Sequence, residues 1–151
     1  MISYNYGNYP NGGHMIIVSA CLLGERCKYN GGDNYSERIE RMLEGEEILP
    51  VCPEALAGLG VPRAPMELVD GVPYNTRGEC LKDRLDVAIE EIKRLAIEKG
   101  VRLAILKSRS PTCGTKEIYD GTFSHTLIPG MGLLARALTD IGIKVVDSED
   151  S

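Results

Sequence analysis

The sequence predicts an α/β fold, in which one parallel β-sheet carries helices on both faces. The chain has 151 residues, 43% of them hydrophobic and 26% charged, which is ordinary for a single globular domain. Short apolar runs of strand length recur along it and alternate with segments of helical periodicity. The runs are apolar throughout, which is typical of strands in a parallel sheet that is covered on both sides.

The first part of the predicted domain holds two strands and a short helix between them. Residues 15–20 (MIIVSA) are the first apolar run, and residues 48–51 (ILPV) are the second. Between them, Ser36 is a typical N-cap, and apolar residues at helical spacing predict an amphipathic helix that ends at Gly45. The segment 53–79 is rich in Pro and Gly, which predicts loops and one hairpin around residues 66–76.

The second part holds the clearest helix of the chain. Between Leu81 and Lys99, apolar residues recur at helical spacing, and Gly100 is a plausible C-cap. The remaining predicted elements are a strand at 101–106, a short strand at 117–119, a turn at Pro129–Gly130, a helix at 131–141 and a strand at 143–146. Alternating strands and helices of this kind predict a single domain with a Rossmann-like parallel sheet.

Residues 1–14 (MISYNYGNYPNGGH) differ in composition from everything that follows. They contain no Asp, Glu, Lys or Arg, and they are rich in Asn, Gly and Tyr. Such a segment adds little to a packed core, and chain ends of this kind are often mobile. We therefore expect a flexible N-terminal extension at residues 1–14 and a single domain at residues 15–151.

Charge and cysteine content narrow the classes of function. Seventeen Lys and Arg against 22 Asp and Glu give a net charge of −5, which disfavours bulk binding to nucleic acid. The longest apolar run, residues 15–24, is too short to span a membrane and lacks the basic flank of an export signal. We therefore expect a cytoplasmic protein with no membrane partner, whose five cysteines are not paired in disulfides. No oligomeric state is predicted.

Three cysteines follow three predicted strands. Cys21 ends the first strand, Cys52 ends the second, and Cys113 lies in the loop after the third. Ligands of open parallel sheets bind at the carboxyl ends of the strands, so we expect these thiols to converge. Three thiolates suit an iron–sulfur cluster or a catalytic zinc ion with one open position. The alternative is packing, because free cysteine often behaves as a small buried hydrophobe.

Polar residues near these cysteines in the sequence are candidates for acid–base catalysis and for substrate binding. Glu54 follows Cys52 closely and could act as an acid or a base. Lys107, Ser108 and Ser110 precede Cys113 and could polarise a carbonyl-like group or orient water, although all of these are also ordinary loop residues. Other residues have weaker signals: Arg63 could bind an anion, His125 is an imidazole near the site, Cys27 could be an auxiliary thiol, and Cys80 has a packing or surface role.

Four segments, in this order, resemble a family of small bacterial proteins that was long of unknown function and now includes thiouracil desulfidases. They are SACLLGERCKYNGG, PVCPEALAGLGVPRAP, LAILKSRSPTCG and IYDGTFSHTLIPGMG, and the resemblance covers about residues 15–147. It implies an enzyme with an oxygen-sensitive [4Fe–4S] cluster held by three cysteines, with the fourth iron free. The matching positions are Cys21, Cys52 and Cys113, so residues 15–151 would form an iron–sulfur domain.

The resemblance also implies a reaction, which is the non-redox desulfuration of a thiolated pyrimidine. Water would replace the sulfur of a thiocarbonyl that the free iron binds, and the substrate would be a small base or nucleoside. By position, we assign Glu54 as the base, Ser108 or Ser110 to orient the substrate, and Lys107 to stabilise developing charge. The alternatives are a zinc-dependent hydrolase with the same three cysteines, or a non-enzymatic module that senses metal or oxidation.

Overall fold

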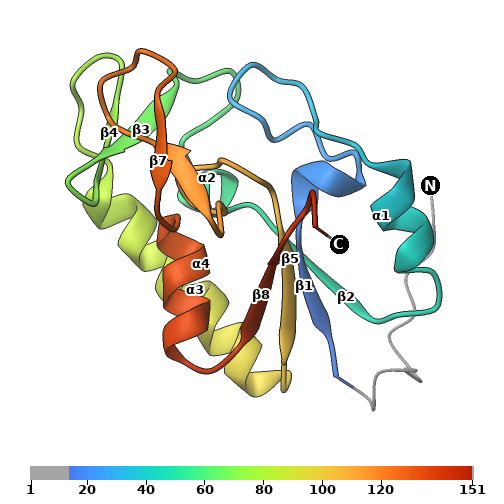
Figure 1. Cartoon of the computed structure of the whole chain (residues 1–151). Coiled ribbons are helices and arrows are strands. Elements are labelled where there is room, and N and C mark those ends of the chain that lie inside the picture. The colour runs from blue at the N-terminus through green and yellow to red at the C-terminus, as the bar shows by residue number, and fades with distance from the viewer. Residues whose placement is uncertain (1–13, 151) are drawn as a thin grey trace.

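A four-stranded parallel sheet forms the centre of the protein in a computed structural model that describes residues 14–150 (Figure 1). The strand order is β2-β1-β5-β8, and every neighbouring pair is parallel. The strands are β1 (Ile16–Ser19), β2 (Ile48–Val51), β5 (Leu103–Leu106) and β8 (Lys144–Asp147). Each lies within or beside an apolar run of the sequence, and the predicted α/β fold is confirmed.

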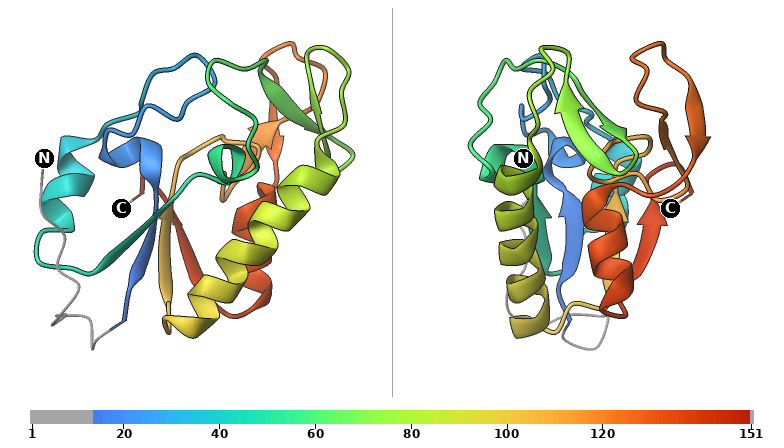
Figure 2. Two further views of the ribbon diagram at one scale, coloured as in Figure 1. Left: turned by 180° about the vertical axis from the view of Figure 1, so that it is seen from behind. Right: turned by 90° about the vertical axis from the view of Figure 1, so that its left-hand side faces the viewer.

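Helices cover both faces of this sheet, as predicted. The helices α3 (Lys82–Glu98) and α4 (Leu133–Asp140) pack on one face, and Figure 2 shows them on the same side of the strands. The short helix α1 (Glu37–Met42) covers the other face with residues of a second core. Side chains alternate along a strand, so Ile17 belongs to the first core while Ile16 and Val18 belong to the second.

Smaller elements gather beyond the carboxyl ends of the strands (Figure 1). The 3₁₀ helix η1 (Ala20–Leu23) follows β1, and the short helix α2 (Pro53–Leu56) follows β2. Two antiparallel pairs complete this end of the molecule. They are β3 (Met66–Val69) with β4 (Val72–Asn75), and β6 (Glu117–Tyr119) with β7 (Leu127–Pro129).

The first of these pairs is the predicted hairpin, whereas β7 was not expected. The sequence predicts a turn at Pro129–Gly130, but Pro129 lies in β7 and pairs with Glu117. All three residues of β7 are exposed, so they show no alternation of buried and exposed side chains. The partner strand, rather than the local pattern, defines this element.

The predicted N-terminal extension lies outside the described residues, except for its last residue. A hydrogen bond of 2.8 Å joins Nδ1 of His14 to the carbonyl oxygen of Gly100, at the turn between α3 and β5. No helix within residues 14–150 is both long and apolar enough to cross a membrane.

Candidate functional site

A cavity of about 460 Å³ lies at the carboxyl ends of the central strands, and four of the five cysteines line it. Cys21 comes from η1, Cys52 is the N-cap of α2, and Cys113 lies in the loop after β5. Cys27 reaches the cavity from the loop between η1 and α1. Cys80 is exposed and does not line it. The topology thus brings together the three cysteines that follow strands, and it adds a fourth.

Cys113 is the most buried of these thiols, with 4% of its surface exposed. Burial raises the pKa of the Cys113 thiol to about 12. Its loop is held by the Ser110 hydroxyl, whose oxygen accepts hydrogen bonds from the backbone N–H groups of Thr112 and Cys113. A cation bound beside Cys113 would favour the thiolate that burial disfavours.

The other thiols have different environments. Burial raises the pKa of Cys21. Cys52 and Cys27 share a hydrogen bond, which lowers the pKa of Cys52 and raises that of Cys27. The Sγ atom of Cys52 also lies 3.9 Å from the carbonyl oxygen of Cys27, and Arg63 donates to that same oxygen at 2.7 Å. Arg63 therefore holds the Cys27 segment next to Cys52.

Soft sulfur donors of this kind suit iron–sulfur clusters and zinc. Three of them, Cys21, Cys52 and Cys113, come from separate segments and line one cavity. Across residues 14–150, no three His, Cys, Asp or Glu side chains form a group that could hold a single metal ion. The soft thiol donors around this cavity fit an iron–sulfur cluster by their chemistry.

Glu54 contacts both Cys52 and the loop that carries Cys113. Its Oε1 atom accepts a hydrogen bond of 3.0 Å from the Thr112 hydroxyl, and its Oε2 atom lies 3.8 Å from Sγ of Cys52. Thr112 is fully buried and precedes Cys113 directly. The carboxylate is thus oriented by the Cys113 loop and lines the cavity.

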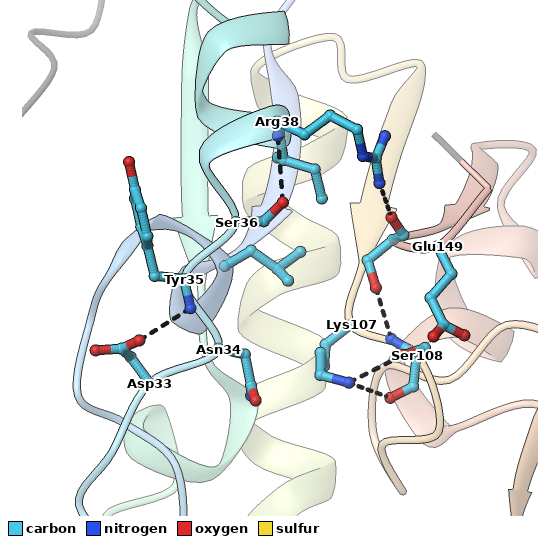
Figure 3. Close-up of a pocket in the computed structure, with 11 residues that line it drawn as sticks. Asp33, Asn34, Tyr35, Ser36, Arg38, Lys107, Ser108 and Glu149 are labelled. Carbon is cyan, nitrogen blue, oxygen red and sulfur yellow. Dashed lines mark hydrogen bonds between the residues drawn. The ribbon is translucent and has the colours of Figure 1, made fainter.

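Three polar residues of the loop after β5 also line the cavity, which are Lys107, Ser108 and Ser110. The first two contact each other, whereas Ser110 contacts the backbone of its own loop. The Lys107 ammonium donates to the Ser108 hydroxyl at 2.9 Å, and burial lowers the pKa of Lys107. Figure 3 shows Lys107 and Ser108 on the border of a second, more polar pocket of about 410 Å³. The Ser110 hydroxyl is engaged by the Cys113 loop, so its contacts are those of a residue that shapes the loop.

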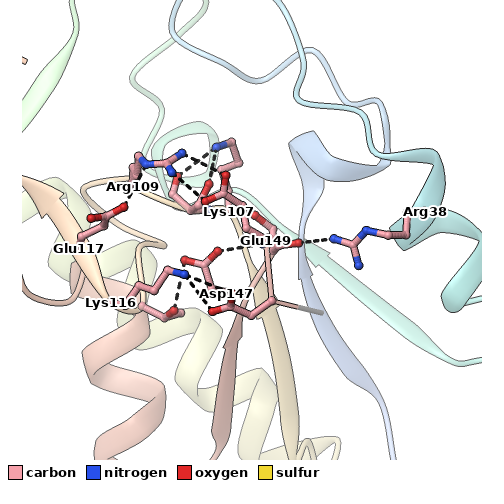
Figure 4. Close-up of polar contacts among 11 residues, drawn as sticks. Arg38, Lys107, Arg109, Lys116, Glu117, Asp147 and Glu149 are labelled. Atoms are coloured by element: carbon pink, nitrogen blue, oxygen red, sulfur yellow. Dashed lines mark hydrogen bonds and ion pairs between the residues drawn. The ribbon is translucent and has the colours of Figure 1, made fainter. Parts of the chain in front are cut away.

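Ion pairs fix the segment that carries these residues. Arg109 contacts Glu117 at 3.1 Å and Glu149 at 2.8 Å, and Lys116 contacts Asp150 at 3.0 Å (Figure 4). These contacts connect the loop after β5 to β6 and to the C-terminal residues. Arg109 also has a left-handed backbone, with φ of 61°. The loop is therefore held from several sides.

Several residues of the cavity are absent from the sequence prediction. His125 and Arg63 line it, but so do side chains with no signal of their own, among them Tyr29, Asn34, Glu67 and Tyr119. They come from loops and hairpins that fold over the sheet edge. A sequence pattern that is read locally does not contain that packing.

The chain is similar to a described protein family, to a bacterial protein and to a solved structure. A family model described as 2-thiouracil desulfurase matches residues 16–150. The protein YbbK of Bacillus subtilis (strain 168), described as uncharacterized, is 35% identical in an alignment of 146 positions that covers 90% of this chain and 97% of that protein. A solved structure titled [4Fe-4S]-dependent thiouracil desulfidase TudS (DUF523Vcz) superposes with a TM-score of 0.83 at 34% identity, covering 90% of this chain and 91% of its own.

Proposed function

The chain belongs to the 2-thiouracil desulfurase family of enzymes, and from this premise we propose that it desulfurates a thiolated pyrimidine at a [4Fe–4S] cluster held by Cys21, Cys52 and Cys113. The observation that carries the proposal is that thiols from three strand ends line one cavity. A solved structure with the same fold is named as a [4Fe-4S]-dependent enzyme, which supports the choice of cofactor. A cytoplasmic location, where thiols stay reduced, is part of the proposal.

When bound, the cluster would supply a Lewis-acidic iron with an open position, which polarises the carbon–sulfur bond of a soft thiocarbonyl group. The net reaction exchanges that sulfur for the oxygen of one water molecule. Sulfur leaves at the oxidation level of sulfide, so no oxidant or reductant is consumed.

Glu54 is the residue that we assign to activate the water. Its carboxylate lines the cavity beside Cys52, and the Thr112 hydroxyl holds its Oε1 atom. An acceptor that is fixed in this way can take a proton from water at its remaining lone pairs and return it to the leaving sulfur. The same carboxylate therefore serves both proton transfers.

We assign Lys107 to stabilise developing charge and Ser108 to orient the substrate. The Lys107 ammonium donates to the Ser108 hydroxyl, and both residues line the cavity. A partly buried cation stabilises the negative charge that develops when water adds to the ring carbon. We assign Ser110 to the shape of the Cys113 loop, because its hydroxyl accepts two backbone N–H groups there.

The test is a metal and sulfide analysis of protein that has been purified without oxygen. We expect iron, acid-labile sulfide and visible absorption in the wild type, together with release of uracil and sulfide from 2-thiouracil. The variants Cys21→Ala, Cys52→Ala and Cys113→Ala should each lose the cluster, because each would remove one of its three anchors.

Two further variants are the matched controls. Cys80→Ala removes an exposed thiol outside the cavity, and Cys27→Ala removes the fourth thiol inside it. Both should retain iron and sulfide. Colourless wild-type protein that takes up no iron and sulfide under anoxic reconstitution would refute the cluster, and zinc in its place would favour the hydrolase alternative.

A further inference from the structure

Part of the cavity is built from the two hairpins rather than from the sheet edge. Glu67 on β3, Tyr119 on β6 and His125 in the β6–β7 connection all line it. Figures 1 and 2 show the two hairpins above the carboxyl ends of the strands, and β3 contacts β6. The reaction proposed above uses none of these three side chains.

Glu67 joins one hairpin to the other. Its side chain is buried, with 9% of the residue exposed, and its Oε1 atom accepts the N–H groups of Gly121 at 3.0 Å and Phe123 at 3.1 Å. The backbones also approach closely, since a Cβ atom on Gly121 would lie 2.6 Å from the carbonyl oxygen of Leu68. A buried carboxylate with two backbone donors holds the β6–β7 connection against β3.

The β6–β7 hairpin that Glu67 holds carries a pair of aromatic side chains to the cavity, Tyr119 on β6 and His125 in the connection. The rings of Tyr119 and His125 have centroids 6.3 Å apart and meet at 83°, which is an edge-to-face contact. Phe123 and His125 have left-handed backbones, with φ of 57° and 61°. Side chains other than glycine seldom adopt that conformation unless surrounding contacts enforce it, and functional sites are where it tends to persist.

We propose that Tyr119 and His125 bind the planar ring of the substrate, and that Glu67 is the positioning residue for this pair. An aromatic face binds a pyrimidine by stacking, and the perpendicular imidazole presents nitrogen atoms to the polar edge of the ring. The proposal rests on the function proposed above and names the part of the site that recognises the base. The thiols and Glu54 would then act on a ring whose plane the hairpins define.

The test uses the cluster-loaded enzyme with three variants: Tyr119→Leu, Glu67→Ala and Glu67→Gln. For each we would measure kcat and KM with 2-thiouracil, the dissociation constant of uracil by calorimetry, and iron per chain. Loss of stacking in Tyr119→Leu should raise KM and the uracil dissociation constant about tenfold while kcat and iron content change little. Glu67→Ala should also raise KM and the uracil dissociation constant, because the hairpin would lose the carboxylate that holds it. Glu67→Gln keeps an acceptor oxygen and should recover most of the affinity.

Tyr35→Leu is the matched control, because Tyr35 is 47% exposed and lies outside this cavity. If Glu67→Ala fails to fold, Tyr119→Leu decides the question alone. Turnover by the wild type with unchanged KM and uracil affinity in Tyr119→Leu would overturn the ring-binding proposal. Uracil binding that depends on Tyr119, without any turnover, would overturn the proposed function and keep the ring site. Wild-type protein that neither turns over 2-thiouracil nor binds uracil would overturn both the proposed function and the ring-binding proposal.

Discussion

Thr112 connects the proposed base to the loop that carries a proposed cluster ligand. Its hydroxyl donates to Glu54, its backbone N–H donates to Ser110, and its neighbour in the chain is Cys113. The residue is fully buried, so water does not compete for these contacts. The direction of the Glu54 carboxylate therefore depends on how the Cys113 loop is placed.

Glu54→Gln tests the role of the carboxylate directly. The amide keeps the size of the side chain but cannot accept a proton from water, so kcat for 2-thiouracil should fall about 10²- to 10⁴-fold. Iron and sulfide per chain should stay at the wild-type level. Glu90→Gln, on the exposed side of α3, is the control. A Glu54→Gln enzyme with wild-type kcat would exclude Glu54 as the base.

Thr112→Val tests whether the hydroxyl orients that base. Valine has nearly the same shape but cannot donate, and a hydrogen bond to a charged group contributes about 1.5–3 kcal/mol. We expect kcat to fall about tenfold or more, since 1.4 kcal/mol corresponds to a factor of ten. Thr112→Ser restores the hydroxyl and should restore most of the rate. Equal loss in both variants would indicate a packing role instead.

At the scale of elements, the loop that carries Cys113 also serves as the N-terminal cap of α4. The first backbone N–H groups of a helix lack partners within it. Here the carbonyl oxygen of Pro111 accepts from Leu133 at 3.0 Å, and that of Thr112 accepts from Leu134 at 2.8 Å. Gly132 donates to the carbonyl oxygen of Gly114 at 2.7 Å. The helix and the loop therefore hold each other in place.

Gly132→Ala should disturb this contact and, with it, the proposed cluster. A Cβ atom at Gly132 would lie 2.4 Å from the carbonyl carbon of Thr112, while the backbone angles (φ −68°, ψ 166°) are ones that alanine can adopt. The clash should cost about 1–3 kcal/mol, lower the thermal midpoint and reduce iron per chain. Gly130→Ala is the matched control, because its Cβ would meet only the Ile118 side chain at 3.3 Å. Full iron content in Gly132→Ala would show that the loop tolerates the shift.

The longer helix and the N-cap of α1 could be predicted because the residues of each element carry the signal themselves. The helix α3 buries Leu85, Ile89 and Ile92 at helical spacing, and the Ser36 hydroxyl accepts the N–H of Ile39 as an N-cap should. The helix α2 lies in a segment that the sequence predicts as loops. It has only four residues, which are too few to show a periodic pattern.

The same distinction applies to the candidate site. The cysteines could be placed because the carboxyl ends of parallel strands share one edge of the sheet. The positions of Glu67 and Tyr119 depend instead on how two hairpins pack over that edge. That packing is a long-range contact, which no local pattern describes.

The molecule as a whole has two functionally different ends. The helices η1 and α2 and both hairpins lie beyond the carboxyl ends of the strands (Figure 1), and the cavity is lined there. At the other end, Ile16 begins β1 with its N–H donated to the carbonyl oxygen of Glu47, and His14 bonds to Gly100. The amino end of the sheet thus stabilises the fold and contributes no described residue to the cavity.

This division predicts that removal of residues 1–13 leaves the enzyme intact. The family model begins matching at residue 16, and the first cavity residue is Ser19. A chain that starts at His14 should keep its iron content, and its kcat/KM for 2-thiouracil should stay within about twofold of the full chain. A chain that starts at Ile17 also loses His14, with its hydrogen bond to Gly100, and the buried Met15 and Ile16, which are 5% and 4% exposed, so its thermal midpoint should fall. If the shorter deletion alone reduced iron content or kcat/KM, residues 1–13 would have to act at the site, and the boundary that the composition suggests would be wrong.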